Sequence, residues 1–226
     1  MKYYAVIVAG GSGNRMQQAV PKQFLLLDGI PVLMHTLQAF YDSQRGPEIL
    51  LVLNESQHAN WEALCCEYNF TIPHKVIKGG EQRFHSVKNA LLSIQGEGIV
   101  AVHDAVRPLV SPQLIDTAFA IATESGNCIV GITPTDSIRK IGSGHKSVAF
   151  NRNEFILVQT PQTFNLAILR KAYEQSYKNE FTDDASVVES AGFEIKVIPG
   201  ERENIKITYP EDLEIAAVFK HKKSSR

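Results

Sequence analysis

The chain has 226 residues, of which 44% are hydrophobic and 21% are charged, and its formal net charge is −1. This length is enough for one α/β domain with a sizeable core and leaves little for a second. The near-neutral charge gives no basic excess that would indicate nucleic acid as a partner, and no run approaches the ~20 apolar residues that cross a bilayer. We therefore expect neither nucleic acid nor a membrane as a partner.

From Tyr4 to Thr133, β-branched runs alternate with helical stretches. The expected strands are 4–8, 49–53, 75–78, 99–103 and 128–133, and the expected helices are 32–41, 55–68, 82–94 and 114–124. This alternation predicts a Rossmann-like, mostly parallel sheet with helices on both faces. Because such sheets bind ligands at the carboxyl ends of their strands, we expect the chemistry just after Val8, Lys78, His103 and Thr133.

The alternation is interrupted at Asp136. Residues 137–141 and 147–150 are strand-like and flank a glycine-rich run, which is typical of a β-hairpin. Helices at 166–177, 185–190 and 211–219 and a strand at 194–198 are expected to follow. Since no repeat or low-complexity linker divides the chain, we expect a single domain over residues 1–226 with an inserted β-arm at about 136–153.

The three cysteines indicate a reducing environment. Cys65 and Cys66 are adjacent, Cys128 stands alone, and none forms a C-x-x-C pair, so neither a disulfide framework nor a zinc site is indicated. The apolar N-terminal run is short and breaks into glycines, which favours a first strand over a signal peptide. We therefore expect a cytoplasmic protein.

A glycine-rich run follows the first strand, from Ala9 through Gly10, Gly11 and Gly13 to Arg15 and Met16. It fits neither a dinucleotide-binding fingerprint, which would need glycine in place of Met16, nor a P-loop, which would need Gly-Lys-Ser/Thr at its end. Such a turn lets backbone N–H groups approach phosphate, and Arg15 and Lys22 add two cations beside it. This pattern suits a triphosphate under attack. A tight turn with two surface cations is the alternative.

Polar residues also follow the later strands. Asp104 ends a buried strand, where its carboxylate either binds Mg²⁺ together with substrate phosphates or caps the next loop. Gly80 and Ser86 can read a base and its ribose, although Ser86 can equally be a hydroxyl on a helix face. Lys206 lies between two isoleucines in an expected strand, so it points away from them, either to solvent or to a phosphate.

Six motifs occur in one order over residues 5 to about 215. They are Ala9-Gly10-Gly11-Ser12-Gly13-x-Arg15-Met16 with Pro21-Lys22-Gln23, Gly79-Gly80-x-x-Arg83-x-x-Ser86-Val87, His103-Asp104-Ala105-Val106-Arg107-Pro108, Gln159-Thr160-Pro161-Gln162, Thr182-Asp183-Asp184-Ala185 and Asn204-Ile205-Lys206-Ile207-Thr208. Together they resemble the 2-C-methyl-D-erythritol 4-phosphate cytidylyltransferase family, within the sugar-nucleotidyltransferase superfamily. The resemblance implies transfer of a cytidylyl group from CTP to a small sugar-alcohol phosphate, in the non-mevalonate isoprenoid pathway.

The resemblance also implies roles for individual residues. The implied catalytic residues are Arg15, Lys22, Arg152 and Lys206. The implied substrate-binding residues are Ala9, Gly10, Gly11, Gly13, Gly80, Arg83, Ser86, Asp104, Arg107, Ser137 and Thr182, with Asp104 also holding the cofactor Mg²⁺. The Gly80–Ser86 segment is assigned to cytidine, and Arg107 and Thr182 to the acceptor phosphate. The family commonly has Asp-Thr where this chain has Asp136-Ser137, and the serine keeps the hydroxyl.

Two segments of the second half leave alternatives open. Thr160-Pro161-Gln162 is either a structural turn or part of a ligand site, and Asp183 can simply cap the helix that follows it. The arm carries Ile138, Ile141, Val148 and Phe150, which need something to pack on. The resemblance implies a homodimer in which Arg152 reaches the partner's substrate phosphate, whereas an arm folded back on its own domain is the alternative.

Two rival functions fit part of this pattern. A ribitol-5-phosphate cytidylyltransferase would share the glycine loop and the Asp-Ala-Val-Arg-Pro stretch, but Arg83-x-x-Ser86-Val87 and Arg152-Asn153-Glu154 favour the methylerythritol enzyme. A non-catalytic nucleotide-binding regulator would be expected to lose Arg15, Lys22 or Asp104, and all three are present. The fold by itself cannot separate these substrates.

Overall fold

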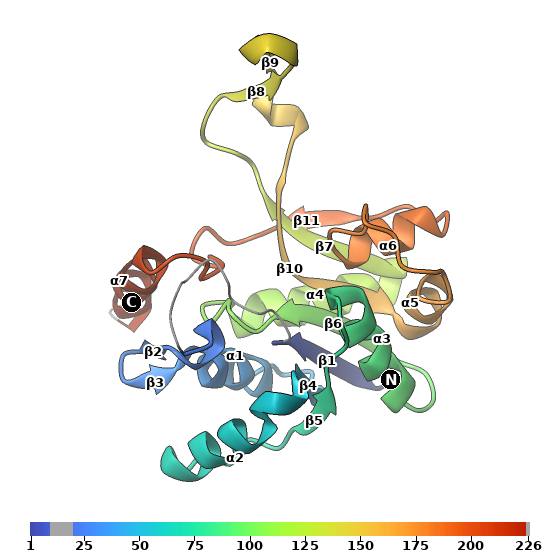
Figure 1. The fold of residues 1–226 in the computed structure, drawn as a ribbon. Helices are drawn as coiled ribbons and strands as arrows, with labels where there is room; N and C mark the ends of the chain where they lie inside the picture. Colours follow the sequence, from blue (N-terminus) through green and yellow to red (C-terminus); the bar gives the residue numbers. More distant parts are fainter. Residues whose placement is uncertain (10–19, 225–226) are drawn as a thin grey trace.

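A seven-stranded sheet forms the centre of the molecule in the computed structural model, which describes residues 1–9 and 20–224 (Figure 1). Its strand order is β11-β7-β10-β6-β1-β4-β5. The strands are β1 (Tyr3–Val8), β4 (Glu48–Leu53), β5 (Lys75–Lys78), β6 (Ile99–Asp104), β7 (Asn127–Ile132), β10 (Leu157–Asn165) and β11 (Val197–Pro199). Every pairing is parallel except those of β10, which is antiparallel to both β6 and β7. The prediction of a mostly parallel sheet is confirmed.

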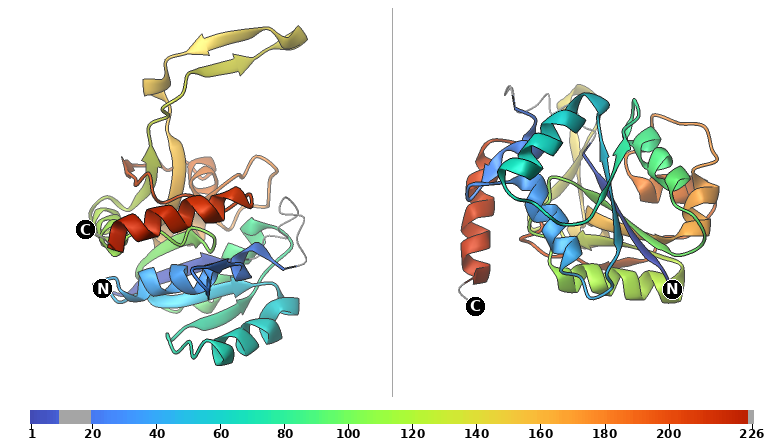
Figure 2. Two further views of the ribbon diagram at one scale, coloured as in Figure 1. Left: turned by 90° about the vertical axis from the view of Figure 1, so that its left-hand side faces the viewer. Right: turned by 90° about the horizontal axis from the view of Figure 1, so that it is seen from below.

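Helices cover both faces of the sheet, as predicted (Figure 2). One face carries α1 (Val32–Tyr41), α2 (His58–Glu67) and α4 (Pro112–Ser125), and the other carries α3 (Arg83–Ser93), α5 (Leu166–Ala172) and α6 (Asp184–Ser190). Alternate residues of β1 serve the two cores, since Ile7 packs under α1 and Val6 under α3. A parallel strand buried on both faces must be apolar throughout, which explains the continuous run of β1.

A third, smaller core supports the C-terminal part of the chain. Helix α7 (Glu211–Ser224) packs against β2 (Leu26–Leu27) around Leu27, Val106 and Ile207, and β2 pairs with β3 (Ile30–Pro31). Within the described part of the chain, no helix is both long and apolar enough to cross a membrane.

Most predicted elements are confirmed, with corrections at their ends. The expected helix 55–68 divides into the 3-10 turn η2 (Glu55–Gln57) and α2, the helix from Leu166 ends at Ala172, and the strand at 194–198 narrows to β11. The helix α4 begins two residues before and ends one residue after the predicted range 114–124. Ser111 caps its first turn by accepting a hydrogen bond from the Leu114 N–H, and Gly126 ends it at φ 86°.

The turn considered at Thr160-Pro161-Gln162 was wrong, because these residues lie inside β10. The pairing of β10 with β7 shifts register between Gln159 and Gln162. Proline lacks an N–H for the ladder, so it occurs in strands where the pairing is irregular. The expected strand around Lys206 is also absent, since the segment from Gly200 to Thr208 has no regular structure. The predicted alternation nevertheless holds, because Ile205 and Ile207 face the third core.

The β-arm projects from the sheet as a separate hairpin (Figures 1 and 2). It consists of β8 (Ile138–Ile141) and β9 (Ser147–Phe150), paired antiparallel with Ile138 opposite Phe150, and joined through the 3-10 turn η3 (Ser143–His145). Its apolar side chains stay largely uncovered, with Ile141 77% and Val148 67% exposed. The hairpin prediction is confirmed.

Candidate active site

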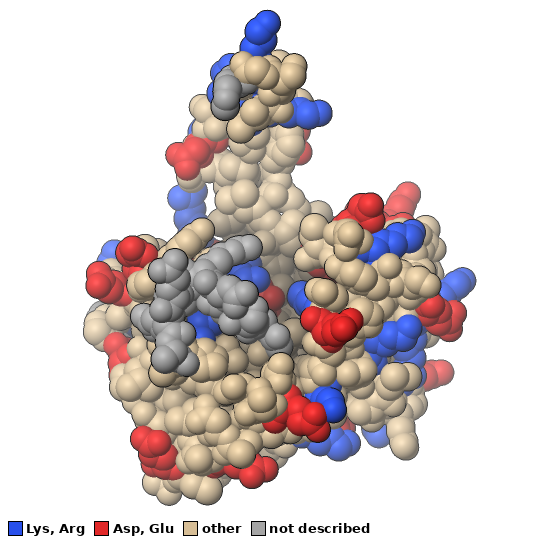
Figure 3. Space-filling model, in the orientation of Figure 1, with Lys and Arg blue, Asp and Glu red and all other residues tan. Residues whose placement is uncertain are grey.

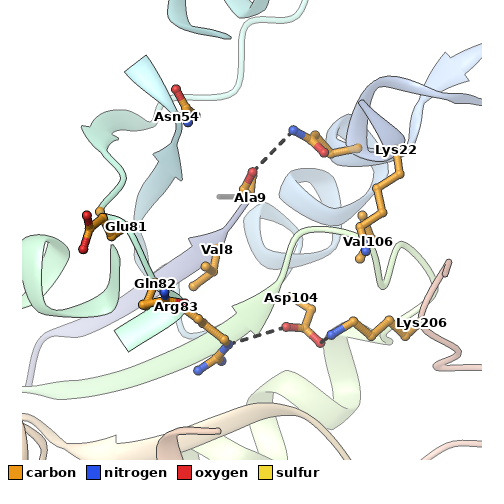
Figure 4. Close-up of a pocket in the computed structure, with 12 residues that line it drawn as sticks. Val8, Ala9, Lys22, Asn54, Glu81, Gln82, Arg83, Asp104, Val106 and Lys206 are labelled. Carbon is orange, nitrogen blue, oxygen red and sulfur yellow. Dashed lines mark hydrogen bonds and ion pairs between the residues drawn. The ribbon is translucent and has the colours of Figure 1, made fainter. Parts of the chain in front are cut away.

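A cleft of about 400 Å³ opens at the carboxyl ends of the central strands (Figure 4). It is lined by residues that follow four neighbouring strands, together with the 3-10 turn η1 (Lys22–Phe24) and the segment carrying Lys206: Val8, Ala9, Lys22, Gln23, Asn54, Gly80, Glu81, Gln82, Arg83, Asp104, Val106 and Lys206. Acidic and basic atoms lie together in the hollow at the centre of the face that Figure 3 shows. The predicted strand ends after Val8, Lys78 and His103 therefore meet at the cleft, whereas Thr133 does not line it.

Asp104 is the charged centre of this cleft. Its Oδ2 lies 3.0 Å from the Lys206 Nζ and 3.2 Å from the Arg107 Nε, and its Oδ1 lies 3.9 Å from the Arg83 Nε. Burial by itself would raise the pKa of Asp104, but Lys206, Arg83 and Arg107 hold that pKa well below its ordinary value. The carboxylate is therefore ionised throughout the neutral range.

Arg107 does not line the cleft, but its contacts stabilise residues that do. Besides its contact with Asp104, its Nη1 donates a hydrogen bond to the Asn204 carbonyl at 2.8 Å. The Asn204 side chain in turn donates to the Thr160 carbonyl at 2.8 Å. These bonds fasten the irregular segment that presents Lys206 to Asp104. The acceptor contact assigned to Arg107 stays a prediction.

Arg83 occupies the first turn of α3 and reaches along the cleft wall. Its Nη1 and Nη2 donate to the two carboxylate oxygens of Asp184, at 2.8 and 2.6 Å. Burial disfavours the charged guanidinium, but Asp184 and Asp104 raise the pKa of Arg83 above its ordinary value. Arg83 therefore carries a fixed positive charge.

The loop at Gly79-Gly80 is held tightly against α3. The Gly80 N–H donates to the Ser86 Oγ at 3.0 Å, and the Gly79 N–H donates to the Leu53 carbonyl at 2.8 Å. Ser86 is buried and does not line the cleft, so its hydroxyl supports the loop from beneath. Direct contact of Ser86 with a base or ribose stays a prediction.

The glycine-rich loop that follows β1 is described only at its two ends. Gly10, Gly11, Gly13 and Arg15 lie outside the described residues. Lys22 lines the cleft, and its catalytic role stays a prediction.

Gln23, next to Lys22, donates from its side-chain amide to the Ala9 carbonyl at 3.3 Å. Sequence reasoning missed Gln23 and Asn54 as lining residues. Asn54 directly follows β4, so the rule that ligands bind at the carboxyl ends of parallel strands could have predicted its place in the cleft.

Three predicted residues lie away from this cleft. Arg152, in the 3-10 turn η4 (Arg152–Glu154) of the arm, donates to the Thr135 carbonyl, and Ser137 begins the arm. Thr182 is exposed just before α6, and the alternative reading of its neighbour Asp183 as a helix cap is confirmed by a capping box with Ser186. The roles assigned to these three residues stay predictions.

His103 packs inside the protein and does not line the cleft. It is fully buried, its ring lies edge-on to Phe40 with the ring centres 5.0 Å apart, and its nitrogens bond the Thr160 hydroxyl and the Arg107 carbonyl. Burial lowers the pKa of His103 to about 3, so the imidazole is neutral. It orders the loop after Asp104 and does not face substrate.

Comparison with known proteins identifies relatives along the whole chain. Residues 3–221 match the family model described as IspD: 2-C-methyl-D-erythritol 4-phosphate cytidylyltransferase. A protein of that description from Azobacteroides pseudotrichonymphae is 51% identical over 214 residues, which cover 94% of this chain and 96% of the relative. One from Bacteroides fragilis is 47% identical over 216 residues, covering 95% and 98%.

Solved structures agree in fold. The crystal structure of 2-C-methyl-D-erythritol 4-phosphate cytidylyltransferase from Thermus thermophilus has a TM-score of 0.79 and 28% sequence identity, covering 98% of this chain and 100% of that one. The 4-diphosphocytidyl-2C-methyl-D-erythritol synthase from Anaerococcus prevotii has a TM-score of 0.83 and 26% identity, with 97% and 96% covered.

Proposed function

The chain belongs to the 2-C-methyl-D-erythritol 4-phosphate cytidylyltransferase family, and from this membership we propose that its reaction takes place in the cleft around Asp104. The enzyme is a nucleotidyltransferase of the isoprenoid pathway. It transfers a cytidylyl group from CTP to 2-C-methyl-D-erythritol 4-phosphate, giving 4-(cytidine 5'-diphospho)-2-C-methyl-D-erythritol and pyrophosphate.

In the proposed mechanism, a phosphate oxygen of the acceptor attacks the α-phosphorus of CTP. A new P–O bond forms as the bond to pyrophosphate breaks, in line with the attack. The acceptor phosphate is already ionised, so no strong general base is needed, and positioning with charge stabilisation suffices. Lys22 and Lys206, which both line the cleft, supply positive charge beside the reacting phosphates, and Arg15 is assigned the same role from its motif.

The observation that carries the proposal is the clustering of charge at the strand ends. Lys206 and Arg107 contact Asp104 at 3.0 and 3.2 Å, and the Gly79-Gly80 loop borders the same cleft. Fixed dipoles and charges in a partly buried site stabilise developing charge without reorganising during the reaction. A triphosphate is the substrate class that such a cleft suits.

Asp104 also fits the proposed Mg²⁺ cofactor. Mg²⁺ is usually held by one or two carboxylates together with substrate phosphates and waters. Among residues 1–9 and 20–224, no group of three or more histidine, cysteine or acidic side chains could hold a metal by itself. Asp104 would therefore bind the ion jointly with the triphosphate. Once bound there, Mg²⁺ would polarise the oxygens of the phosphoryl group whose phosphorus is attacked.

Two measurements test this proposal. Pyrophosphate release should require CTP and 2-C-methyl-D-erythritol 4-phosphate together, and ribitol 5-phosphate should not replace the acceptor. Binding of CTP should also slow amide hydrogen exchange around Gly80 and Arg83, since both line the cleft. Unchanged exchange at this loop in the presence of saturating CTP would place the nucleotide elsewhere and contradict the assignment.

We propose further that the enzyme is a homodimer whose arms complete each other's active sites. The support is the exposure of apolar side chains on and beside the arm, with Ile141 77%, Val148 67% and Leu157 53% exposed. Exchange of such an element between identical copies is a low-cost route to a two-fold dimer. In this arrangement Arg152 acts on the substrate phosphate of the partner.

Co-expression of two inactive variants tests the exchange of arms. Lys22→Ala and Arg152→Ala should each be nearly inactive alone. In equal amounts, random pairing makes about half of the dimers mixed, and each mixed dimer regains one intact site, so activity should return to about a quarter of wild type. If Arg152 acts within its own chain, every site carries one lesion and no activity returns.

We also assign the enzyme to the cytoplasm. Cys65, Cys66 and Cys128 are all free thiols, which suits a reducing compartment. Fractionation of cells that express a tagged enzyme tests this assignment, and recovery in the membrane or secreted fraction would contradict it.

A further inference from the structure

A wholly buried carboxylate lies directly behind the wall of the cleft. Asp184, at the start of α6, has no exposed surface. It accepts two hydrogen bonds from Arg83 and a third from the Tyr173 hydroxyl at 2.6 Å. Burial raises the pKa of Tyr173 well above its ordinary value, so the phenol keeps the proton that it donates. Of Asp184, Tyr173 and Arg83, only Arg83 lines the cleft.

Two carboxylates compete for the same guanidinium. Arg83 makes its bidentate bond to Asp184, at 2.6 and 2.8 Å, while its Nε stays 3.9 Å from the Asp104 Oδ1. The longer distance exceeds a hydrogen bond. Figure 4 shows the Arg83 side chain pointing along the cleft wall toward Asp104. Arg83 therefore lies near Asp104 but beyond hydrogen-bonding distance of it.

The two oxygens of Asp104 therefore have different contacts. Oδ2 lies 3.0 Å from the Lys206 Nζ and 3.2 Å from the Arg107 Nε. Oδ1 accepts no hydrogen bond from any residue in the described ranges 1–9 and 20–224. Among the described residues, hydrogen bonds therefore engage Oδ2 of Asp104 and not Oδ1.

The start of α6 is anchored well enough to hold Arg83 in place. Gln162 donates from its side-chain amide to the Asp183 Oδ2 at 2.8 Å, and its Oε1 accepts from the Ala185 N–H at 2.9 Å. Gln162 lies in β10, in the middle of the sheet. The Asp184 carboxylate is therefore presented from a rigid element, as a preorganised site needs.

We propose that Asp184, assisted by Tyr173, is a positioning residue that holds the Arg83 guanidinium away from Asp104. It thereby keeps Arg83 from hydrogen bonding to Oδ1 of the carboxylate that would hold Mg²⁺ together with CTP. Without the Asp184 charge, the buried guanidinium would be uncompensated, and such a group is strongly driven to the nearest carboxylate. That carboxylate is Asp104, which would then be neutralised on both oxygens. The inference rests on the proposed function of the cleft.

Asp184→Asn tests the proposal because it removes the charge and preserves the shape. Partners that orient a reacting group typically contribute about 10–100-fold, so kcat/KM for CTP should fall by this factor. The KM for 2-C-methyl-D-erythritol 4-phosphate should change less than kcat/KM for CTP, because the proposal concerns the nucleotide side of the site. Tyr173→Phe removes one hydrogen bond only and should lower kcat/KM for CTP in the same direction by a smaller factor.

A double substitution separates positioning from simple destabilisation. If Asp184→Asn lowers activity because Arg83 moves onto Asp104, the double variant with Arg83→Gln should lose less activity than the product of the two single losses. Two independent roles would instead multiply their losses. Asp116→Asn is the matched control, since Asp116 also accepts several bonds, from Ser43 and Gln44, away from the cleft. It should lower the Tm and leave kcat/KM unchanged.

The outcomes separate this inference from the proposed function. A folded Asp184→Asn enzyme with wild-type kcat/KM for CTP, or losses that multiply in the double variant, would overturn the positioning role. Calorimetric binding of CTP gives a readout that does not depend on turnover. If the wild type binds CTP and releases no pyrophosphate with the acceptor, the proposed function fails, while weaker CTP binding by Asp184→Asn still supports the positioning role.

Discussion

Gly80 gives the sharpest test of the nucleotide loop. A Cβ at this position would lie 2.4 Å from the Cβ of His85 and 2.9 Å from its carbonyl carbon. These atoms belong to the first turns of α3, whose Phe84 and Val87 are buried in the core. The helix cannot withdraw, so Gly80→Ala must move the loop itself.

The structure sets the size of the effect. Carbon atoms in contact normally lie about 3.5–4.0 Å apart, so the loop has to shift by about 1 Å. The shift also strains the bond from the Gly80 N–H to the Ser86 Oγ, which is 3.0 Å long. Since a misplacement of about 1 Å can cost about 10²-fold in rate, we expect kcat/KM for CTP to fall by about that factor.

Steady-state kinetics with each substrate varied in turn provides the assay. Overpacking of this kind typically costs about 1–3 kcal/mol, so the variant should remain folded in a thermal unfolding experiment. Gly142→Ala is the matched control, because a Cβ there meets only the Lys146 carbonyl at an ordinary 3.6 Å. A Gly80→Ala enzyme that binds and uses CTP like wild type would refute the claim that this loop touches the nucleotide.

Four further outcomes are expected. Asp104→Asn should lower kcat by about 10²–10³ and weaken the Mg²⁺ dependence, and an unchanged metal titration would contradict the assignment. Lys22→Ala should lower kcat by a similar factor of about 10²–10³, whereas near-normal turnover would remove its role. The pKa of His103 is about 3 in the folded protein, below its ordinary 6.5, so the unfolded chain takes up this proton first as pH drops. The free energy of unfolding, measured by urea unfolding, should therefore fall between pH 6.5 and pH 3. The fall should be shallower in His103→Gln. Burial raises the pKa of the Cys128 thiol to about 12, so iodoacetamide should label exposed Cys66 well before Cys128. Peptide mapping measures the two labelling rates, and equal rates would contradict this burial.

Local patterning was enough to predict most of the framework. The limits of α1 and β5 agree with prediction residue for residue, and those of β1, β4 and β6 within one residue. These elements have a strong hydrophobic period or a continuous apolar run, and both signals reside in neighbouring residues. The strand-end rule likewise predicted that Gly80 and Asp104 would share one edge of the sheet, because parallel strands end together.

The prediction was wrong where a strand lacked such a local signal. β10 contains Gln159, Thr160, Pro161 and Gln162, a polar run with a proline that looks like a turn. It forms a strand because β6 and β7 lie on either side and supply partners for its backbone. An antiparallel strand inserted between two others depends on the order of the sheet, which no single segment of sequence specifies.

The amino-acid sequence by itself determined most of the elements, the family motifs and the strand ends at which polar residues gather, since each depends on residues close together in the chain. Only the tertiary structure decided which charges pair. Arg83 and Asp184 are 101 positions apart, and Lys206 reaches Asp104 from a segment without regular structure. Both pairs exist because the strand order brings distant loops to one edge of the sheet, where burial makes each charge depend on its partner.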